Sequence, residues 1–179
     1  GFLPIKDEFG ELKEVINLDG PKVEATVELV EAAVEAERKV IVWCAYTPEI
    51  AALVKVLDKF GAVVITGKTT APDRAQRIEW FQKDPKVSVF IGQIRAGGTG
   101  TTLTAGRTVI YYSNTFSLED RLQSEDRAHR IGQRFDVDYI DLVCRGTIDR
   151  TILKAHRSKK QLADMVLGNV RAALEGELE

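Results

Sequence analysis

The sequence predicts an α/β domain in which a parallel sheet is covered by helices on both faces. Short apolar runs alternate along the chain with segments whose apolar residues recur at helical spacing. The runs are nearly continuous in apolar residues, which is typical of strands buried on both faces. Each connection between runs is long enough for a helix to return the chain to the same edge of the sheet, which makes the strands parallel.

Five helices are expected from apolar stripes and from residues that favour helix ends. Pro21 fits a first helical position, Thr47-Pro48 combines an N-cap with such a proline, and Gly61 ends that second helix. Ser117 and Thr147 are further N-cap candidates. The expected helices begin at Gly20-Pro21, Thr47, Pro72, Ser117 and Thr147, and the fourth runs through the arginine-rich stretch near residue 130.

Five strands are expected between these helices. They cover residues 40–45, 62–66, 87–91, 107–112 and 137–143. Parallel sheets bind ligands in the loops that follow the carboxyl ends of their strands. Those loops are residues 44–48, 66–71, 92–104, 113–117 and 144–147.

One domain of ordinary size accounts for the 179 residues. It is expected to span residues 20–167, after a flexible leader of little periodicity at 1–19. A tail at 168–179 is expected either to end the last helix or to be disordered. The net charge of −2 excludes a surface coated in basic residues, so nucleic-acid binding would need a local patch or backbone amides. No apolar run reaches the length of a membrane span, and no signal pattern opens the chain.

The two cysteines, Cys44 and Cys144, lie in apolar, strand-like runs. Their number and spacing fit neither a metal site nor a disulfide framework. We therefore expect two buried, reduced thiols and no metal site.

The loop Gly67-Lys68-Thr69-Thr70 follows a strand and precedes a helix, as a nucleotide-binding P-loop does. A P-loop needs a glycine five positions before the Gly-Lys pair, and Ala62 occupies that position inside the strand. The loop is also too short to surround a triphosphate. Two interpretations remain: Gly67, Lys68 and Thr69 contact a nucleic-acid phosphate at the helix N-terminus, or the segment is a plain turn.

A glycine- and threonine-rich loop occupies residues 92–104. Its glycines, Gly97, Gly98 and Gly100, allow the backbone to approach a ligand closely. Hydroxyl groups, including those of Thr101 and Thr102, and the charge of Arg95 suit phosphate and ribose oxygens. A tight connection without a ligand is the alternative.

An arginine-rich segment follows at residues 121–134. Helical spacing places Gln123, Arg127 and Arg130 on one face, where two guanidinium groups repel each other unless an anion lies between them. Glu125 and Asp126 could supply that anion as an exposed ion-pair face. Alternatively, the two arginines point at a phosphate bound elsewhere. His129 is expected to pack or hydrogen-bond, since no nucleophile or metal partner lies near it in the sequence.

The run from Gln123 to Gln133, which contains Asp-Arg-Ala-His-Arg-Ile-Gly-Gln, closely resembles helicase motif VI of the Swi/Snf family of superfamily-two ATPases. Residues 95–100 resemble motif V of that family, residues 39–44 resemble motif IV, and residues 67–81 resemble the segment after it. Gly146-Thr147-Ile148-Asp149 and the helix that follows are similar to the stretch that closes the lobe. The resemblance covers nearly all of residues 21–167.

The resemblance implies a three-layer RecA-like domain, the second of two motor lobes. Arg127 and Arg130 would be arginine fingers oriented with help from Gln123, and Gly98 and Gly100 would also contact the nucleotide. ATP and Mg²⁺ would be bound mainly by the first, N-terminal RecA-like lobe, so the isolated chain is expected to be inactive. Double-stranded DNA would be the partner of Gly67, Lys68, Thr69, Arg95, Gly97, Thr101 and Thr102, and no membrane partner is expected.

Two residues depart from the family pattern, because a serine is usual near Gln93 and an asparagine near Thr102. The compact lobe, without large insertions, does not favour a nucleosome remodeller over a microbial or phage translocase. The expected location is nuclear for a eukaryotic source and cytoplasmic, at the nucleoid, for a microbial or phage source. A non-catalytic nucleic-acid-binding or regulatory domain remains the alternative. An unrelated nucleotide-binding enzyme is disfavoured because the sequence has no P-loop and no Gly-x-Gly-x-x-Gly.

Overall fold

The computed structural model describes residues 2–6, 12–17, 20–96 and 101–176. Its main sheet contains β3 (Lys39–Cys44), β4 (Ala62–Ile65), β5 (Val89–Gln93), β6 (Gly106–Tyr111) and β7 (Asp138–Asp141). These strands lie in the order β4-β5-β3-β6-β7, and every neighbouring pair is parallel. The predicted parallel sheet and its five strands are therefore confirmed, with ends shifted by one or two residues.

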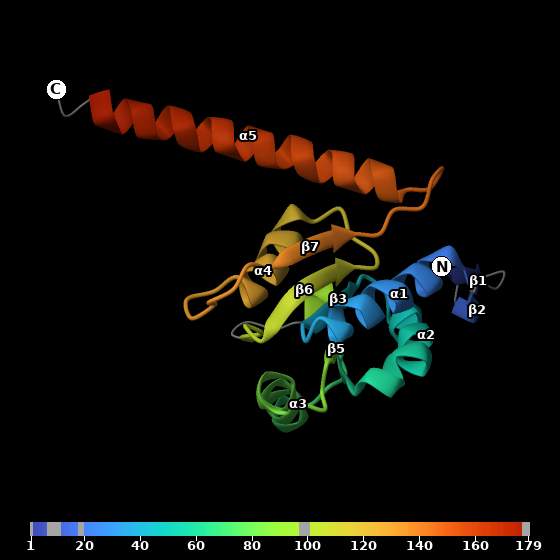
Figure 1. The fold of residues 1–179 in the computed structure, drawn as a ribbon. Coiled ribbons are helices and arrows are strands. Elements are labelled where there is room, and N and C mark those ends of the chain that lie inside the picture. The colour runs from blue at the N-terminus through green and yellow to red at the C-terminus, as the bar shows by residue number, and fades with distance from the viewer. Residues whose placement is uncertain (1, 7–11, 18–19, 97–100, 177–179) are drawn as a thin grey trace.

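In the described part of the chain, five helices lie before, between and after these strands and cover both faces of the sheet (Figure 1). They are α1 (Pro21–Glu35), α2 (Thr47–Leu57), α3 (Ala71–Lys83), α4 (Leu118–Ala128) and α5 (Asp149–Gly176), and two short 3₁₀ turns, η1 (Asp58–Phe60) and η2 (Ile94–Ala96), follow α2 and β5. The three-layer α/β architecture predicted from the alternation of helices and strands is thus present.

Two hydrophobic clusters, one on each face of the sheet, hold the layers together. Alternate residues of the central strand β3 enter opposite clusters: Val40 and Val42 pack with α1 and α2, whereas Ile41 and Trp43 pack with α3 and the end of α4. All four side chains are fully buried. A central strand flanked on both faces excludes water from both sides, and this explains why β3 reads as a continuous apolar run.

Two helix starts differ in detail from the expected ones, and a third is as expected. The N-cap of α2 is Tyr46 rather than Thr47, and the Glu49 carboxylate accepts a hydrogen bond from the Tyr46 amide at 3.2 Å. The helix α5 begins at Asp149, and the Thr147 hydroxyl accepts from the Asp149 amide at 3.4 Å. Ser117 caps α4 as expected, with its hydroxyl accepting from the Asp120 amide at 3.1 Å.

The end of α4 corrects a prediction that matters for the site. The helix stops at Ala128, and His129 occupies the C-cap with φ −96° and ψ 80°, so Arg130 lies in the following loop. Arg127 and Arg130 therefore do not share a helix face. The carbonyl groups of Arg127 and Ala128 accept hydrogen bonds from other segments, as described below, instead of from a further helical turn.

The segments outside residues 20–167 form regular structure where they are described. The strands β1 (Phe2–Lys6) and β2 (Leu12–Asn17) pair as an antiparallel hairpin, which the sequence did not predict, and β2 lies against α2. At the other end α5 continues to Gly176, and Figure 1 shows its second half projecting beyond the sheet. Among the described residues, no helix combines the length and apolar character needed to cross a membrane.

Candidate nucleotide and nucleic-acid site

A cavity of about 440 Å³ lies where α4 ends, beside the segment that enters β6. Three residues predicted from the arginine-rich segment line it, Gln123, Arg127 and Arg130, and Thr101 from the glycine-rich loop joins them. The fold therefore brings together residues from two motifs that are more than twenty positions apart. Its remaining lining residues are Asp126, His129 and Ile131.

Arg127 is the buried arginine of this cavity, with only 8% of its surface exposed. Burial lowers the pKa of its guanidinium group, and the positive charges of Arg74 and Arg130 lower it further. Arg74 comes from α3, so three arginines from three segments contribute positive potential at this position. An anion placed in the cavity would offset that charge.

Arg130 is exposed, and its Nη1 atom donates a hydrogen bond to the Thr102 hydroxyl at 3.1 Å. One of the two acids that could have neutralised the pair has another partner: the Glu125 carboxylate lies 2.6 Å from Nε of Arg121. The second, Asp126, is an exposed lining residue of the cavity. Glu125 therefore pairs with a residue of its own helix. Of the two acids, only Asp126 remains to neutralise Arg127 and Arg130 in an exposed ion-pair face.

Gln123 is also exposed, and its amide donates to the Glu119 carboxylate one helical turn earlier, at 3.0 Å. This contact holds the Gln123 side chain along α4. The sequence placed Gln123 as a residue that orients the arginines. In the structure it lines the same cavity as they do.

Two glutamines fix the segment 101–106 between α3 and the end of α4. The Gln82 amide donates to the Thr102 carbonyl at 3.0 Å, and its oxygen accepts from the Ala105 amide at 2.8 Å. From the other side, the Gln133 amide nitrogen lies within hydrogen-bonding distance of three carbonyls, those of Thr104 at 2.9 Å, Ala128 at 3.2 Å and Gly106 at 3.3 Å. The segment that carries Thr101 and Thr102 is therefore held by one side chain from α3 and one from the loop after α4.

The structure describes residues 92–96 and 101–104 of the glycine-rich loop. Arg95 lies in η2, and its Nε atom is 3.0 Å from the Asp120 carboxylate in the first turn of α4 while the side chain stays 70% exposed. Thr101 is buried and Thr102 is half-buried. The predicted contacts of Gly97, Gly98 and Gly100 lie outside the described residues.

The turn at residues 66–70 satisfies most of its own polar groups. The Lys68 amide donates to the Thr66 hydroxyl at 3.3 Å, and the Thr69 hydroxyl accepts from the Thr66 amide at 3.0 Å. The Thr70 hydroxyl caps α3 by accepting from Asp73. These contacts favour the plain-turn interpretation for the threonines. Gly67 and Lys68 are exposed, so the Lys68 ammonium group is the part of this turn that can reach a phosphate.

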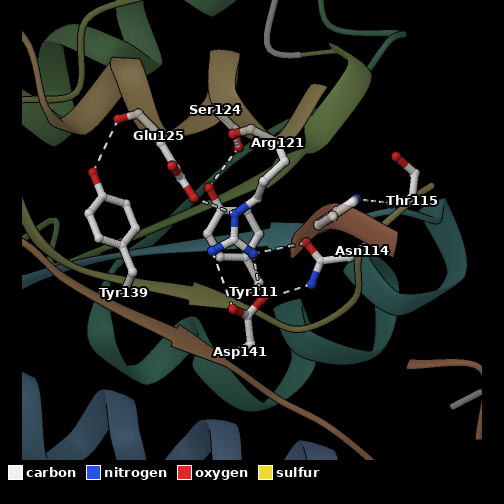
Figure 2. A network of polar contacts seen from close by, with 9 residues as sticks. Tyr111, Asn114, Thr115, Arg121, Ser124, Glu125, Tyr139 and Asp141 are labelled. Atoms are coloured by element: carbon white, nitrogen blue, oxygen red, sulfur yellow. Dashed lines mark hydrogen bonds and ion pairs between the residues drawn. The ribbon is translucent and has the colours of Figure 1, made fainter. Parts of the chain in front are cut away.

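Behind the cavity, a polar network fixes the other end of α4 (Figure 2). Its centre is Arg121, which is 9% exposed and stacks over the Tyr111 ring with the guanidinium carbon 3.4 Å from the ring centroid. Arg121 donates to both carboxylate oxygens of Asp141, at 2.5 and 3.3 Å, and to the Asn114 side chain at 3.1 Å. The charge and hydrogen bonds of Asp141 raise the pKa of Arg121 against the opposing effect of burial.

Sequence reasoning missed Gln82, Arg74 and Arg121 as members of the site. Gln82 and Arg74 lie on α3, far along the chain from the residues they contact or influence. Arg121 was read as part of an arginine-rich run without a role of its own. Its polar partners Asn114 and Asp141 come from the loop after β6 and from β7, so no spacing rule could have joined them.

A second cavity, of about 560 Å³, lies near the starts of α2 and α5 and is larger than the first. Its charged groups have partners within the domain. The Lys22 ammonium lies 2.7 Å from Asp149, and the Ser113 hydroxyl donates to the buried Glu49 carboxylate at 2.5 Å. Burial raises the pKa of Glu49 in spite of these hydrogen bonds. The arginine-lined cavity, rather than this larger one, therefore has the chemistry of an anion site.

The fold and this site define a class of protein. Residues 21–132 match the model of the helicase conserved C-terminal domain, and the chain belongs to that family. Within it, the chain is related to the Swi/Snf family of chromatin remodelers, as the motif VI resemblance predicted.

Three relatives illustrate the relationship. The chain is 32% identical over 157 residues to the helicase SWR1 of Candida glabrata, and 34% identical over 160 residues to the ATP-dependent helicase fft2 of Schizosaccharomyces pombe. These alignments cover 87% and 88% of the chain but only 11% and 12% of the relatives. It is 37% identical over 106 residues to the chromatin-remodeling ATPase INO80 of Candida albicans, an alignment that covers 59% of the chain and 8% of that protein. The chain thus corresponds to about a tenth of the length of these proteins.

A solved structure supports the fold independently. The crystal structure of the C-terminal part of the Fun30 ATPase domain superposes with a TM-score of 0.73 at 28% sequence identity. The match covers 77% of this chain and 46% of the other. The domain described here therefore has the fold of a RecA-like helicase lobe.

Proposed function

We propose that this chain is the second motor lobe of an ATP-driven translocase that moves on double-stranded DNA. In this proposal Arg127 and Arg130 point at the phosphates of an ATP molecule held mainly, with its Mg²⁺ ion, by a first RecA-like lobe. Lys68, Arg95 and the threonines at 101–102 contact the backbone of one DNA strand. ATP-dependent opening and closing of the two lobes then moves the protein along that strand.

One observation carries the nucleotide part of this proposal. Arg127 is buried beside Arg74 and Arg130, and burial and both positive neighbours all act against its charge. Like charges held this close repel each other, and an anion placed among them offsets that repulsion. Phosphate groups supply negative charge at the right density, and guanidinium groups bind them through paired N–H donors.

The arginines also suit the chemistry of phosphoryl transfer. Negative charge on the phosphate oxygens changes during transfer, and a positive group placed there beforehand stabilises the transition state. An arginine supplied from a neighbouring domain contributes about 10³–10⁵ in rate in well-studied nucleotidases. The Gln133 side chain binds both the Thr104 carbonyl and the Ala128 carbonyl, next to Arg127. These hydrogen bonds would hold Arg127 in place before the nucleotide arrives.

The DNA part rests on exposed positive and polar groups in loops after the parallel strands. Lys68 follows β4 and Arg95 follows β5, and both side chains are exposed. These strands are neighbours in the sheet, so their carboxyl ends lie at one edge. Such contacts bind the backbone and not the bases, which suits a protein that moves along DNA of any sequence.

The location of the protein follows from its substrate. We expect it in the nucleus if its source is eukaryotic, and at the nucleoid in the cytoplasm if its source is microbial or a phage. The similarity to chromatin-remodeling ATPases makes DNA packaged by proteins a second candidate substrate.

Turnover of ATP tests the proposal. The protein that joins this lobe to a first lobe should hydrolyse ATP faster with duplex DNA than without it, and Arg130→Ala should lower that turnover by about 10³-fold. ATP binding, measured with a fluorescent analogue, should change little because the first lobe supplies most contacts. Arg134→Ala is the matched control, since this exposed arginine lies outside the cavity lining.

Turnover that survives the loss of Arg130 contradicts the arginine-finger assignment. A protein that binds duplex DNA and shows no DNA-dependent turnover at all supports the alternative, a non-catalytic nucleic-acid-binding or regulatory domain.

A further inference from the structure

The helix that carries Arg127 is fixed to the domain at both ends. Its last turn offers carbonyl groups that have no partner within the helix. Two of these accept hydrogen bonds from other segments: Arg127 from the Leu103 amide at 2.9 Å and Ala128 from the Gln133 amide at 3.2 Å. The Glu125 carbonyl, which already accepts from the His129 amide at 3.0 Å, also accepts from the Tyr139 hydroxyl at 3.2 Å. The position at which α4 ends is therefore set by β7, by the segment entering β6 and by the loop after the helix.

The first half of α4 is fixed by Arg121. One guanidinium group binds the Glu125 carboxylate on its own helix, the Asn114 amide oxygen in the preceding loop and the Asp141 carboxylate on β7. Figure 2 shows the guanidinium plane lying against the Tyr111 ring of β6. An arginine can do this because its planar group donates five hydrogen bonds in a fixed geometry, whereas a lysine ammonium cannot.

A second contact ties α4 to the same strand. The hydroxyls of Ser124 and Tyr111 lie 2.7 Å apart, and the Ser124 hydroxyl also contacts the Arg121 carbonyl at 2.7 Å. Both Tyr111 and Ser124 are almost completely buried. Rotation of α4 about its axis would break this contact together with those of Arg121, so the rotational setting of the helix is specified.

We infer that Arg121 is a positioning residue for Arg127, and that it sets the direction from which this arginine enters the nucleotide cavity. The inference rests on the proposed function. Arg121 and Arg127 lie six residues apart on a helix of 11 residues, so a small tilt at Arg121 moves the guanidinium group of Arg127. Displacements of about 1 Å at a reacting centre can lower a rate about 100-fold.

The same network extends to α5. The His156 ring nitrogen Nε2 lies 2.7 Å from the Thr115 carbonyl, and the Lys159 ammonium donates to the Phe116 carbonyl at 2.9 Å. Thr115 and Phe116 form the loop that leads into α4. The entry to the helix is therefore held by α5, while Arg121 and Tyr139 hold its body and its end.

Kinetics of the two-lobe protein can separate positioning from general stability. In Arg121→Lys, which keeps the charge and loses the forked contacts, we expect kcat for DNA-stimulated ATP hydrolysis to fall about tenfold, with KM for ATP changed less than about twofold. The decisive measurement repeats the substitution in an Arg127→Ala background. There, Arg121→Lys should lower the residual kcat less than about twofold, because the group it positions is gone.

Two further variants make the test secure. Tyr139→Phe removes only the hydroxyl that donates to the Glu125 carbonyl, and it replaces Arg121→Lys if that variant fails to fold. We expect kcat to fall about threefold in Tyr139→Phe, and we expect no such fall in the Arg127→Ala background. Arg38→Lys is the control: Arg38 pairs with Asp138, another aspartate of β7, and its substitution should leave kcat unchanged.

The possible failures can be told apart. An equal fall in both backgrounds, or no fall in either, overturns the positioning role while leaving the proposed function intact. Full turnover by Arg127→Ala alone overturns the proposed function, and the positioning role with it, without reference to Arg121.

Discussion

The Leu103 amide donates a hydrogen bond to the Arg127 carbonyl at 2.9 Å, and this contact joins the segment entering β6 to the end of α4. Leu103 is fully buried, and Arg127 is 8% exposed. The segment that follows the motif V resemblance and the segment that resembles motif VI are therefore parts of one polar assembly. A substitution in either segment should therefore shift the backbone of the other.

The hydrogen bonds of the Gln133 side chain should contribute measurably to the stability of the domain. Gln133→Ala removes the donor shared by the carbonyls of Thr104, Gly106 and Ala128, and we expect the free energy of unfolding to fall by about 1–3 kcal/mol because half-buried carbonyls lose their partner. Urea denaturation measures this. Gln76→Ala on the exposed face of α3 is the control and should change the free energy by less than about 0.5 kcal/mol. Equal effects of the two substitutions would show that the Gln133 hydrogen bonds do not stabilise the domain.

The glycines at 92 and 106 should differ in their tolerance of a methyl group. A Cβ atom at Gly92 would lie 2.5 Å from the Trp43 ring and 2.6 Å from the Phe90 ring. Both rings are fully buried and cannot move aside. We expect Gly92→Ala to destabilise the domain by roughly 1–3 kcal/mol through overpacking.

Gly106→Ala is the matched comparison, because its Cβ would meet Cδ1 and Cγ1 of Ile41, a side chain that is also fully buried but whose terminal methyl group can rotate away. The midpoint of urea denaturation should fall less for Gly106→Ala than for Gly92→Ala. The reverse order would show that Ile41 is the less adaptable neighbour.

The stability of the domain should fall as the pH drops below about 6.5, partly through His156. Burial lowers the pKa of His156 below its usual value of 6.5, although the Thr115 carbonyl opposes this shift. The unfolded chain therefore takes up a proton at a higher pH than the folded domain, and the free energy of unfolding decreases between the unfolded and the folded pKa. The charges of Arg121, Asp141 and Lys159 act on the same ring.

Thermal melting between pH 5 and pH 8 checks this pH dependence. The difference in melting temperature between the wild type and His156→Gln should vary with pH below about 6.5 and be constant above about 7. A glutamine amide can replace the ring as donor to the Thr115 carbonyl without taking up a proton. A difference that is independent of pH would assign the loss of stability to other groups.

Lys68 should contribute one phosphate contact to DNA binding. Lys68→Gln is expected to weaken binding to duplexes of different sequence by a similar factor and to reduce the slope of log K against log salt by about 1. Titration at several salt concentrations measures this slope. Lys83→Gln, at the far end of α3 where the lysine pairs with Glu79, should leave it unchanged. An unchanged slope in Lys68→Gln would limit the turn at 66–70 to a structural role.

Much of the fold could be predicted because it depends on local patterns. The run that became β3 is apolar at every position from Val40 to Cys44, and a strand covered on both faces requires that. Ser117 marked the start of α4 because capping selects particular residues. Gly61, with a φ of +66°, ends the 3₁₀ turn η1 rather than α2 itself, which stops at Leu57. The hairpin of β1 and β2 was missed because its strands carry no clear alternation of apolar and polar residues.

The sequence by itself determined the class of domain and the identity of its arginine segment, since both are written in residues that are close together in the chain. Only the tertiary structure decided where that segment stops being helical, that Glu125 pairs with Arg121 and that Arg74 adds its charge near Arg127. The helix end and the charge of Arg74 depend on contacts between residues more than twenty positions apart. The Arg121–Glu125 pair is only four positions long, but Asp141 on β7 binds the same guanidinium group. Such contacts form only after the sheet has brought β6, β7 and the ends of α3 and α4 together.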